Sequence, residues 1–310
     1  MKALITGSEG FVGQYLREEL ELHGIEVIRA DIVDRPEVRR VDLLDADAVS
    51  GLLAETLPDC LFHLAGQADI GKSWKQPQLT VKLNVLAAVN VLEAVRLSDA
   101  GNTRIVMIGS SDQYGLLGAA GERVTEETPM RPMSPYAVSK RAQEEMAALY
   151  ARSFGLSVCM TRSFNHGGAG QRTGFMIPDF ASGIVKLERG LRADLPVGNL
   201  SARRDFTHVR DIVRAYRLIA EKGLPGEIYN VGSGVATSAR EVLDRLIAMA
   251  RCPIPVRQDP ARMRPSDTPV ICCDHTKLTR DTGWEPSIPL EQILKDTLEW
   301  FRSLPDEMLM

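Results

Sequence analysis

The chain has 310 residues, of which 44% are hydrophobic and 25% are charged, a composition typical of a globular protein with a sizeable core. Its 37 basic and 41 acidic residues give a net charge of −4, so the chain carries no general positive field that would attract nucleic acid. No apolar run reaches the length of a membrane-spanning helix, and a strand pattern starts at once without a targeting segment, so we expect a cytoplasmic protein that binds no membrane. The five cysteines lack the paired spacing of a metal site, and we predict no metal.

Apolar runs typical of strands alternate with segments of helical periodicity through the first two-thirds of the chain. The expected strands are Lys2 to Thr6, Ile25 to Ala30, Cys60 to Leu64, Arg104 to Ile108 and Leu156 to Arg162. The expected helices are Phe11 to His23, Asp45 to Thr56, Leu79 to Leu97 and Tyr136 to Phe154. This alternation predicts a parallel sheet covered by helices, an α/β architecture of the doubly wound Rossmann type.

After about Asn165 the pattern changes to loops rich in Gly, Arg and Pro between shorter elements. Helices are expected near Ile177 to Arg189, Val209 to Glu221, Ser238 to Ala250 and Leu290 to Arg302. We therefore predict a Rossmann domain over residues 1–165, to which residues 205–234 return. A smaller α/β lobe, formed by residues 166–204 and 235–310, is expected to bind the substrate.

A glycine-rich turn, Gly7-Ser-Glu-Gly10-Phe-Val-Gly13, follows the first strand and opens the first helix. Backbone N–H groups at a helix N-terminus bind a pyrophosphate, and glycines let it approach closely. The bare spacing is a weak signal, because three glycines can also form only a tight turn. Its position between a strand and a helix nevertheless predicts a dinucleotide site that includes Phe11 and Val12.

Asp31 ends the second strand, where a carboxylate accepts hydrogen bonds from the adenosine ribose and repels a 2′-phosphate. We therefore predict that NAD(H) is favoured, with NADP(H) as the second option because Arg29 or Arg35 could soften the discrimination. The alternative is that Asp31 is a solvated loop acid.

Tyr136 and Lys140 lie four residues apart on one face of a predicted helix, which Ser134 and Pro135 are expected to begin. By itself this spacing fits one amphipathic turn with a lysine that reaches solvent. Beside a dinucleotide site, however, a cation would lower the pKa of the phenol and make it a proton shuttle. Ser110 ends a strand on the edge where ligands of parallel sheets bind, and would orient a substrate carbonyl.

These motifs, with His63-Leu-Ala-Gly66 and Ser110-Ser111, resemble the extended short-chain dehydrogenase/reductase family of nucleotide-sugar enzymes over nearly the whole chain. Ser163-Phe-Asn-His166, Gly198 to Thr207 and Arg264-Pro-Ser-Asp267 are similar to its GDP-mannose branch. The resemblance implies further cofactor contacts at Asp42, Leu43, Leu64, Ala65 and Gly66. It implies substrate contacts at Ser111, Asn165, Arg204, Arg264 and Asp267.

The resemblance further implies the NAD(P)H-dependent reduction of the C4 ketone of GDP-4-keto-6-deoxy-D-mannose to GDP-D-rhamnose, in a homodimer. A 4,6-dehydratase is an alternative, because it uses the same Ser, Tyr and Lys with an added base for C5. Related dehydratases have a glutamate where this chain has Asp112, whose shorter side chain weakens that reading. A C4 epimerase and a non-catalytic nucleotide-binding protein are further alternatives. One sequence also leaves open the face of hydride addition, so the C4 epimer, a GDP-6-deoxytalose, is an alternative product.

Overall fold

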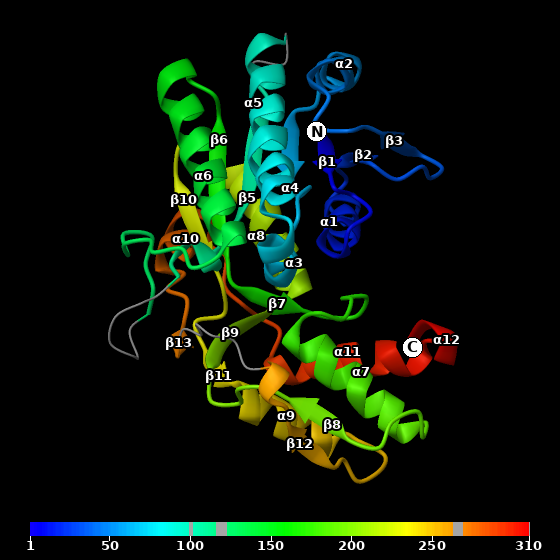
Figure 1. Cartoon of the computed structure of the whole chain (residues 1–310). Helices are drawn as coiled ribbons and strands as arrows, with labels where there is room; N and C mark the ends of the chain where they lie inside the picture. Colours follow the sequence, from blue (N-terminus) through cyan, green and yellow to red (C-terminus); the bar gives the residue numbers. More distant parts are fainter. Residues whose placement is uncertain (99–101, 116–122, 263–268, 310) are drawn as a thin grey trace.

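The computed structural model describes residues 1–98, 102–115, 123–262 and 269–309 (Figure 1). Its main sheet has seven parallel strands in the order β10-β6-β5-β4-β1-β2-β3. The strands are β1 (Lys2–Thr6), β2 (Glu26–Asp31), β3 (Val38–Arg40), β4 (Cys60–His63), β5 (Arg104–Ser110), β6 (Val158–Ser163) and β10 (Ile228–Val231). The direction of winding reverses between β1 and β4, and ligands of such sheets bind at this switch point, outside the carboxyl ends of the strands.

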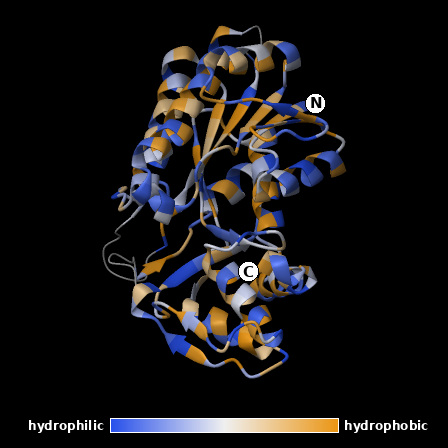
Figure 2. Ribbon diagram, turned by 45° about the vertical axis from the view of Figure 1, so that its right-hand side comes forward, coloured by the Kyte–Doolittle hydropathy of each residue, from blue (hydrophilic) through white to orange (hydrophobic). Residues whose placement is uncertain are grey.

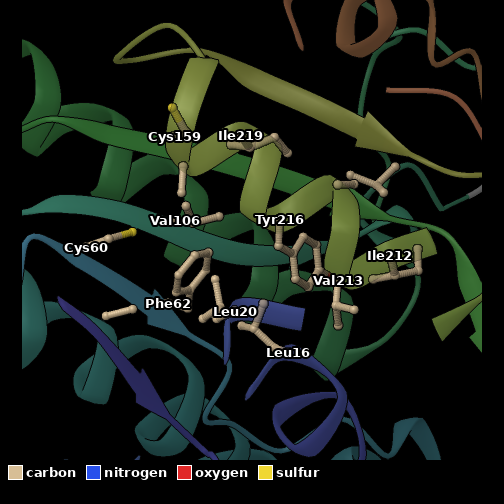
Figure 3. Packing of buried hydrophobic residues seen from close by; sticks show 14 of the residues in the cluster. Leu16, Leu20, Cys60, Phe62, Val106, Cys159, Ile212, Val213, Tyr216 and Ile219 are labelled. Atoms are coloured by element: carbon tan, nitrogen blue, oxygen red, sulfur yellow. The ribbon is translucent and has the colours of Figure 1, made fainter. Parts of the chain in front are cut away.

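Helices cover both faces of the main sheet, which confirms the predicted doubly wound fold. One face carries α1 (Phe11–Leu22) and α8 (Val209–Lys222), and the other carries α2 (Ala46–Thr56), α5 (Ala87–Leu97) and α6 (Pro135–Phe154). Figure 3 shows Leu16 of α1 and Tyr216 of α8 packed together over strand residues such as Phe62 and Val106. In Figure 2 the central strands are hydrophobic along their length, as expected for strands buried on both faces.

The expected helix from Leu79 to Leu97 forms as α4 (Pro77–Val81), a π-helical turn η1 (Lys82–Leu86) and α5. By length and composition the 21 residues Pro77–Leu97 could cross a membrane, so the expectation that no segment reaches that length is wrong. Apolar helices in protein cores have the same composition. Val91, Leu92 and other α5 residues are fully buried against the sheet and its neighbouring helices, which assigns α5 to the core of the fold.

The smaller lobe has its own sheets and its own hydrophobic core. In one sheet β9 (Arg203–His208) pairs with β7 (Asn165–Gly167), β11 (Ala236–Ser238) and β13 (Val270–Ile271), and β8 (Leu195–Val197) pairs with β12 (Val256–Gln258). The helices α7 (Met176–Glu188), α9 (Ala239–Ala248) and α11 (Leu290–Ser303) surround this core. The remaining short elements are α3 (Ile70–Lys75), η2 (Ser111–Gln113), η3 (Pro260–Arg262), α10 (Thr276–Thr282) and α12 (Asp306–Leu309).

The segment 205–234 is divided between the two parts of the molecule. Its first residues belong to β9 in the smaller sheet, whereas α8 and β10 lie on and in the main sheet. Asn165, expected to end the first domain, already pairs with β9. The return to the main sheet therefore starts at α8, a few residues later than position 205.

Candidate active site

A cavity of about 1140 Å³ connects the carboxyl ends of the main sheet with the smaller lobe. It is lined by most of the residues that the sequence singles out, namely Gly7, Gly10, Phe11, Val12, Gly13, Leu64, Gly66, Ser110, Ser111, Asp112, Tyr136, Lys140, Asn165 and Arg204. Residues more than 190 positions apart in the chain therefore share one site, which is large enough for a dinucleotide and a second ligand.

The glycine turn at one end of the cavity is packed against other backbone atoms. Gly7 has a φ of +78°, and a Cβ added there would lie 2.7 Å from the Ala65 nitrogen. A Cβ on Gly13 would lie 2.5 Å from the Gly7 oxygen. Gly10 is the N-cap of α1, where no side chain caps the free N–H groups. A turn without side chains before open N–H donors fits the pyrophosphate of a dinucleotide, which Gly7, Gly10 and Gly13 would hold.

The Asp31 carboxylate is fixed in place by the same turn. Its Oδ2 accepts a hydrogen bond of 3.0 Å from the Glu9 N–H, and its Oδ1 accepts one of 2.7 Å from the Ile32 N–H. These two hydrogen bonds hold the Asp31 carboxylate at the carboxyl end of β2. This fixed position favours the ribose-binding interpretation over that of a solvated acid.

The other expected contacts with the adenosine half are less directly supported. Asp42 is exposed, Leu43 packs into the core against α2 and α5, and Ala65 packs beside Gly7. These three residues and Asp31 lie outside the lining of the cavity. Their roles stay predictions.

Ser110, Tyr136 and Lys140 meet in the middle of the cavity, and all three are buried. Ser134 caps α6 by accepting a hydrogen bond of 3.1 Å from the Ala137 N–H, as the sequence predicts. The Ser110 Oγ accepts a hydrogen bond of 3.2 Å from the Asp112 N–H. The Ser110 hydroxyl lies near the Tyr136 phenol, and both side chains line the cavity, where both can reach one substrate oxygen.

The pKa of the Tyr136 phenol is raised, opposite to the lowering that the sequence predicts. Burial is the main cause, the negative charge of Asp112 adds to it, and the hydrogen bond with Ser110 opposes it. The Lys140 ammonium instead donates to the Ile108 carbonyl at 2.8 Å and to the Gln143 amide oxygen at 2.9 Å. Burial lowers the pKa of Lys140 to about 8. Tyr136 thus keeps its proton at neutral pH, as an ordinary phenol does, and burial makes it a weaker acid than the sequence predicts.

Asn84 belongs to the site but was not selected as a site residue from the sequence. It lies fully buried on the π-helical turn η1, where its Oδ1 accepts from the Gln67 N–H at 2.7 Å. Its Nδ2 donates to the Gln67 carbonyl at 3.0 Å and to the Ser139 Oγ at 2.9 Å. Asn84 thus ties the loop after β4 to α6 between Tyr136 and Lys140. The sequence signal for this role was the polar amide side chain of Asn84 within an otherwise apolar helix, which indicates a buried hydrogen-bond partner.

A buried polar network behind Ser110 was also missed. Gln113 accepts from the Ser110 N–H at 2.9 Å and donates to the Glu144 carboxylate at 2.8 Å. Glu144 forms an ion pair of 2.7 Å with Arg162, and both side chains are at most 5% exposed. This network joins η2, α6 and β6, and it fixes the backbone that carries Ser110.

At the other end of the cavity, Asn165 of β7 and Arg204 of β9 line the wall from two neighbouring strands. Asn165 is exposed, and the Arg204 Nη1 donates to the Arg203 carbonyl at 2.9 Å. Asp205, a candidate structural partner for Arg204, is buried and accepts hydrogen bonds from Ser233, Gly234 and Cys273. Arg264 and Asp267 lie outside the described residues.

Metal-binding side chains are not gathered in the described part of the chain. Between residues 1 and 309, apart from 99–101, 116–122 and 263–268, no group of three or more His, Cys, Asp or Glu side chains could hold a metal ion. The cysteines Cys60, Cys159, Cys272 and Cys273 are buried, Cys252 is half-buried, and all five are free thiols.

Comparison with known proteins agrees with this geometry. The family described as GDP-mannose 4,6 dehydratase matches residues 4–297. The chain is 34% identical to GDP-6-deoxy-D-mannose reductase of Pseudomonas aeruginosa over 99% of both chains. It is 28% identical to a GDP-mannose 4,6-dehydratase of Vibrio cholerae, over 95% of this chain and 91% of the relative.

Solved structures give the same result. RMD from Pseudomonas aeruginosa complexed with NADPH has a TM-score of 0.88 and 33% identity, over 97% of this chain and 99% of that chain. UDP-glucose 4-epimerase from Thermus thermophilus in complex with NAD also has a TM-score of 0.88, with 30% identity over 98% and 99% of the two chains. The chain therefore belongs to the GDP-mannose 4,6-dehydratase family of the extended short-chain dehydrogenase/reductases, which are NAD(P)-dependent enzymes of nucleotide sugars.

Proposed function

We propose that this protein reduces the C4 ketone of GDP-4-keto-6-deoxy-D-mannose to GDP-D-rhamnose, a step of deoxysugar biosynthesis. The observation that carries the proposal is the geometry: the buried side chains of Ser110, Tyr136 and Lys140 line the same cavity as the glycine turn. A reduction at C4 needs one proton donor beside the ketone oxygen, and the Tyr136 phenol supplies it. The similarity to GDP-6-deoxy-D-mannose reductase supports the choice of substrate.

In this proposal the chain's own groups act on the ketone oxygen. A bound NAD(P)H supplies the hydride that adds to C4. Ser110 donates a hydrogen bond to the ketone oxygen, since its own Oγ already accepts from the Asp112 N–H. Tyr136 then transfers its proton to the oxygen, on which negative charge develops as the hydride arrives. Lys140 holds a positive charge beside the site and would hydrogen-bond the ribose next to the nicotinamide.

The substrate would lie along the smaller lobe. Arg204 and Asn165 line the wall there, and a guanidinium can bind a diphosphate through charge-assisted hydrogen bonds. This local positive charge is what the chain, with a net charge of −4, needs to hold an anionic sugar nucleotide. We assign Arg264 and Asp267 to the nucleoside on the family resemblance alone.

A dehydratase is the second candidate, and the position of Asp112 is the observation that favours it. Asp112 lines the cavity, and its charge acts on the Tyr136 phenol, so a carboxylate lies near the sugar. A base for C5 is what dehydration requires in addition to Ser, Tyr and Lys. The carboxylate is nevertheless one methylene shorter than that of the glutamate in related dehydratases, and a displacement of about 1 Å costs a large factor in rate.

We also propose that the protein is a homodimer. The adjacent helices α4, α5 and α6 lie side by side on one edge of the molecule (Figure 1). These helices and the turn η1 carry exposed apolar side chains, including Leu79, Val81, Leu86, Val138 and Leu149. A second copy of the same surface would bury these side chains across a two-fold axis. Light scattering after gel filtration would give twice the mass of the 34.1 kDa chain if this is correct.

The function is tested by offering each substrate separately. Purified protein is mixed in one assay with GDP-mannose and NAD⁺ or NADP⁺, and in another with the 4-keto-6-deoxy derivative and NADH or NADPH, and the product sugar is identified by NMR. Oxidation of the reduced cofactor with the keto sugar, with GDP-D-rhamnose as the product, is the expected result. Conversion of GDP-mannose to the keto sugar would identify a dehydratase instead.

A further inference from the structure

A compact cluster of charges lies where the glycine turn meets the carboxyl end of β2. The Glu9 carboxylate receives two guanidiniums, Arg29 at 3.7 Å and Arg35 at 3.2 Å. Arg29 also pairs with Glu37 at 3.2 Å. The Glu9 side chain is only 10% exposed and lines the cavity, whereas that of Arg35 is 59% exposed. Figure 1 shows β1 and α1, the elements on either side of the turn, and β2, which pairs with β1.

This cluster lies beside the group proposed to bind the adenosine ribose. The backbone N–H of Glu9 donates a hydrogen bond to the Asp31 carboxylate, so the Glu9 side chain begins next to that carboxylate. Two of the guanidiniums that could neutralise a 2′-phosphate, those of Arg29 and Arg35, are therefore already paired with Glu9. A third arginine, Arg40, lies opposite Asp31 on β3, outside these ion pairs with Glu9.

We propose that Glu9 is a specificity-determining residue that, with Asp31, makes the site select NADH over NADPH. The inference rests on the proposed function only in taking this turn as the adenosine end of the cofactor site. A 2′-phosphate carries nearly two negative charges at neutral pH, and it would meet the Glu9 and Asp31 carboxylates together. The 2′-hydroxyl of NADH meets no such repulsion and can donate to Asp31. Glu9 thus acts by its own charge and by keeping Arg35 from the phosphate.

The test compares the dissociation constants of NADH and NADPH for the Glu9→Gln protein with those of the wild type, by fluorescence titration at low salt. Glutamine keeps the size of the side chain, and the N–H donor to Asp31 is a backbone group, so the turn keeps its hydrogen bond. NADPH affinity should rise by about tenfold, while NADH affinity should change less than threefold. Adding Arg35→Ala to Glu9→Gln should remove most of the gain, because Arg35 is the guanidinium that Glu9→Gln releases.

Glu21→Gln is the matched control, since it removes one carboxylate paired with an arginine at the far end of α1. It should leave the ratio of the two constants unchanged. Melting temperatures of all variants report whether they fold, and the shift on adding each dinucleotide gives a second measure of binding. A folded Glu9→Gln protein that binds NADH with an unchanged ratio would overturn the inference. Failure of the wild type to bind either dinucleotide would overturn the proposed function, and this inference with it.

Discussion

The two ends of the cavity are built in different ways. At the dinucleotide end the contacts are made by backbone, since a Cβ on Gly7 or Gly13 would meet main-chain atoms within 2.7 Å. At the substrate end they are made by side chains on short strands, with Asn165 exposed and Arg204 half-buried. Backbone geometry is hard to change, while side chains can be exchanged one at a time. Chains similar to this one are named as reductases, dehydratases and epimerases, so activity differs within the range of sequences that share this fold.

The largest effect is expected where the two ends meet, at Tyr136. Tyr136→Phe removes the proton donor and keeps the ring, so kcat should fall by about 10²- to 10⁴-fold. Binding of NADH and of the sugar nucleotide should remain within a few-fold of the wild type, since neither end of the cavity is altered. Steady-state kinetics with dinucleotide titration measure both. A Tyr136→Phe protein with more than a tenth of the normal kcat would remove Tyr136 from the chemistry.

For Lys140, which lies between the two ends of the cavity, the prediction concerns the stability of the fold rather than the reaction rate. Its pKa is about 8 in the folded protein against 10.5 for an ordinary lysine, so the unfolded chain binds more protons between these values. Below pH 8, burial of the charged Lys140 ammonium lowers the free energy of unfolding. This destabilisation disappears as the pH rises from 8 toward 10.5. Relative to Lys140→Met, the wild type should gain about 3 kcal/mol of unfolding free energy over that window. Urea unfolding at several pH values tests it, and a difference that stays constant with pH would contradict it.

At the dinucleotide end, Gly13→Ala and Gly10→Ala form a matched pair. The new Cβ of Gly13→Ala would lie 2.5 Å from a backbone oxygen, but that of Gly10→Ala would lie 3.3 Å from one. Gly13→Ala should cost about 1–3 kcal/mol of stability and weaken dinucleotide binding, and Gly10→Ala should do less of both. Thermal unfolding with and without NADH measures the pair. Equal effects of the two substitutions would show that backbone contact does not shape this end.

At the substrate end, Arg204→Met should act on one ligand alone. Losing a charge-assisted hydrogen bond costs about 1.5–3 kcal/mol, so KM for the sugar nucleotide should rise by roughly tenfold or more. The dissociation constant of NADH should not change, because the dinucleotide end does not depend on this side chain. Parallel kinetics and titration measure both. If Arg204→Met weakened both ligands alike, the two ends would not be separable.

Local patterns in the sequence were enough to predict the glycine turn at the first end of the cavity and the helix that carries Tyr136 and Lys140. The strand, the glycine turn and α1 are continuous in the chain, and Tyr136 and Lys140 share one helix, so their spacing fixes their geometry. The direction of the Tyr136 pKa shift could not be predicted in this way. It depends on burial and on Asp112, neither of which is visible in the spacing of a Tyr and a Lys.

The residues that the sequence analysis missed act across long separations in the chain. Glu144 and Arg162 are 18 residues apart, and Asn84 is bonded to Ser139, 55 residues away. A buried polar side chain in an apolar segment signals that a partner exists, but only the fold identifies that partner. In the sequence, Glu9 is only a residue between two glycines of the turn. The fold brings Arg29 and Arg35 to its carboxylate.

The central claim is that the keto sugar receives hydride at C4 while Tyr136 supplies the proton. NADH carrying deuterium at its reactive carbon, with GDP-4-keto-6-deoxy-D-mannose as the second substrate, tests this directly by NMR of the product. The account predicts one deuterium at C4 of GDP-D-rhamnose with the wild type and almost none with Tyr136→Phe. Deuterium at C6, or a converted sugar without deuterium, would contradict it.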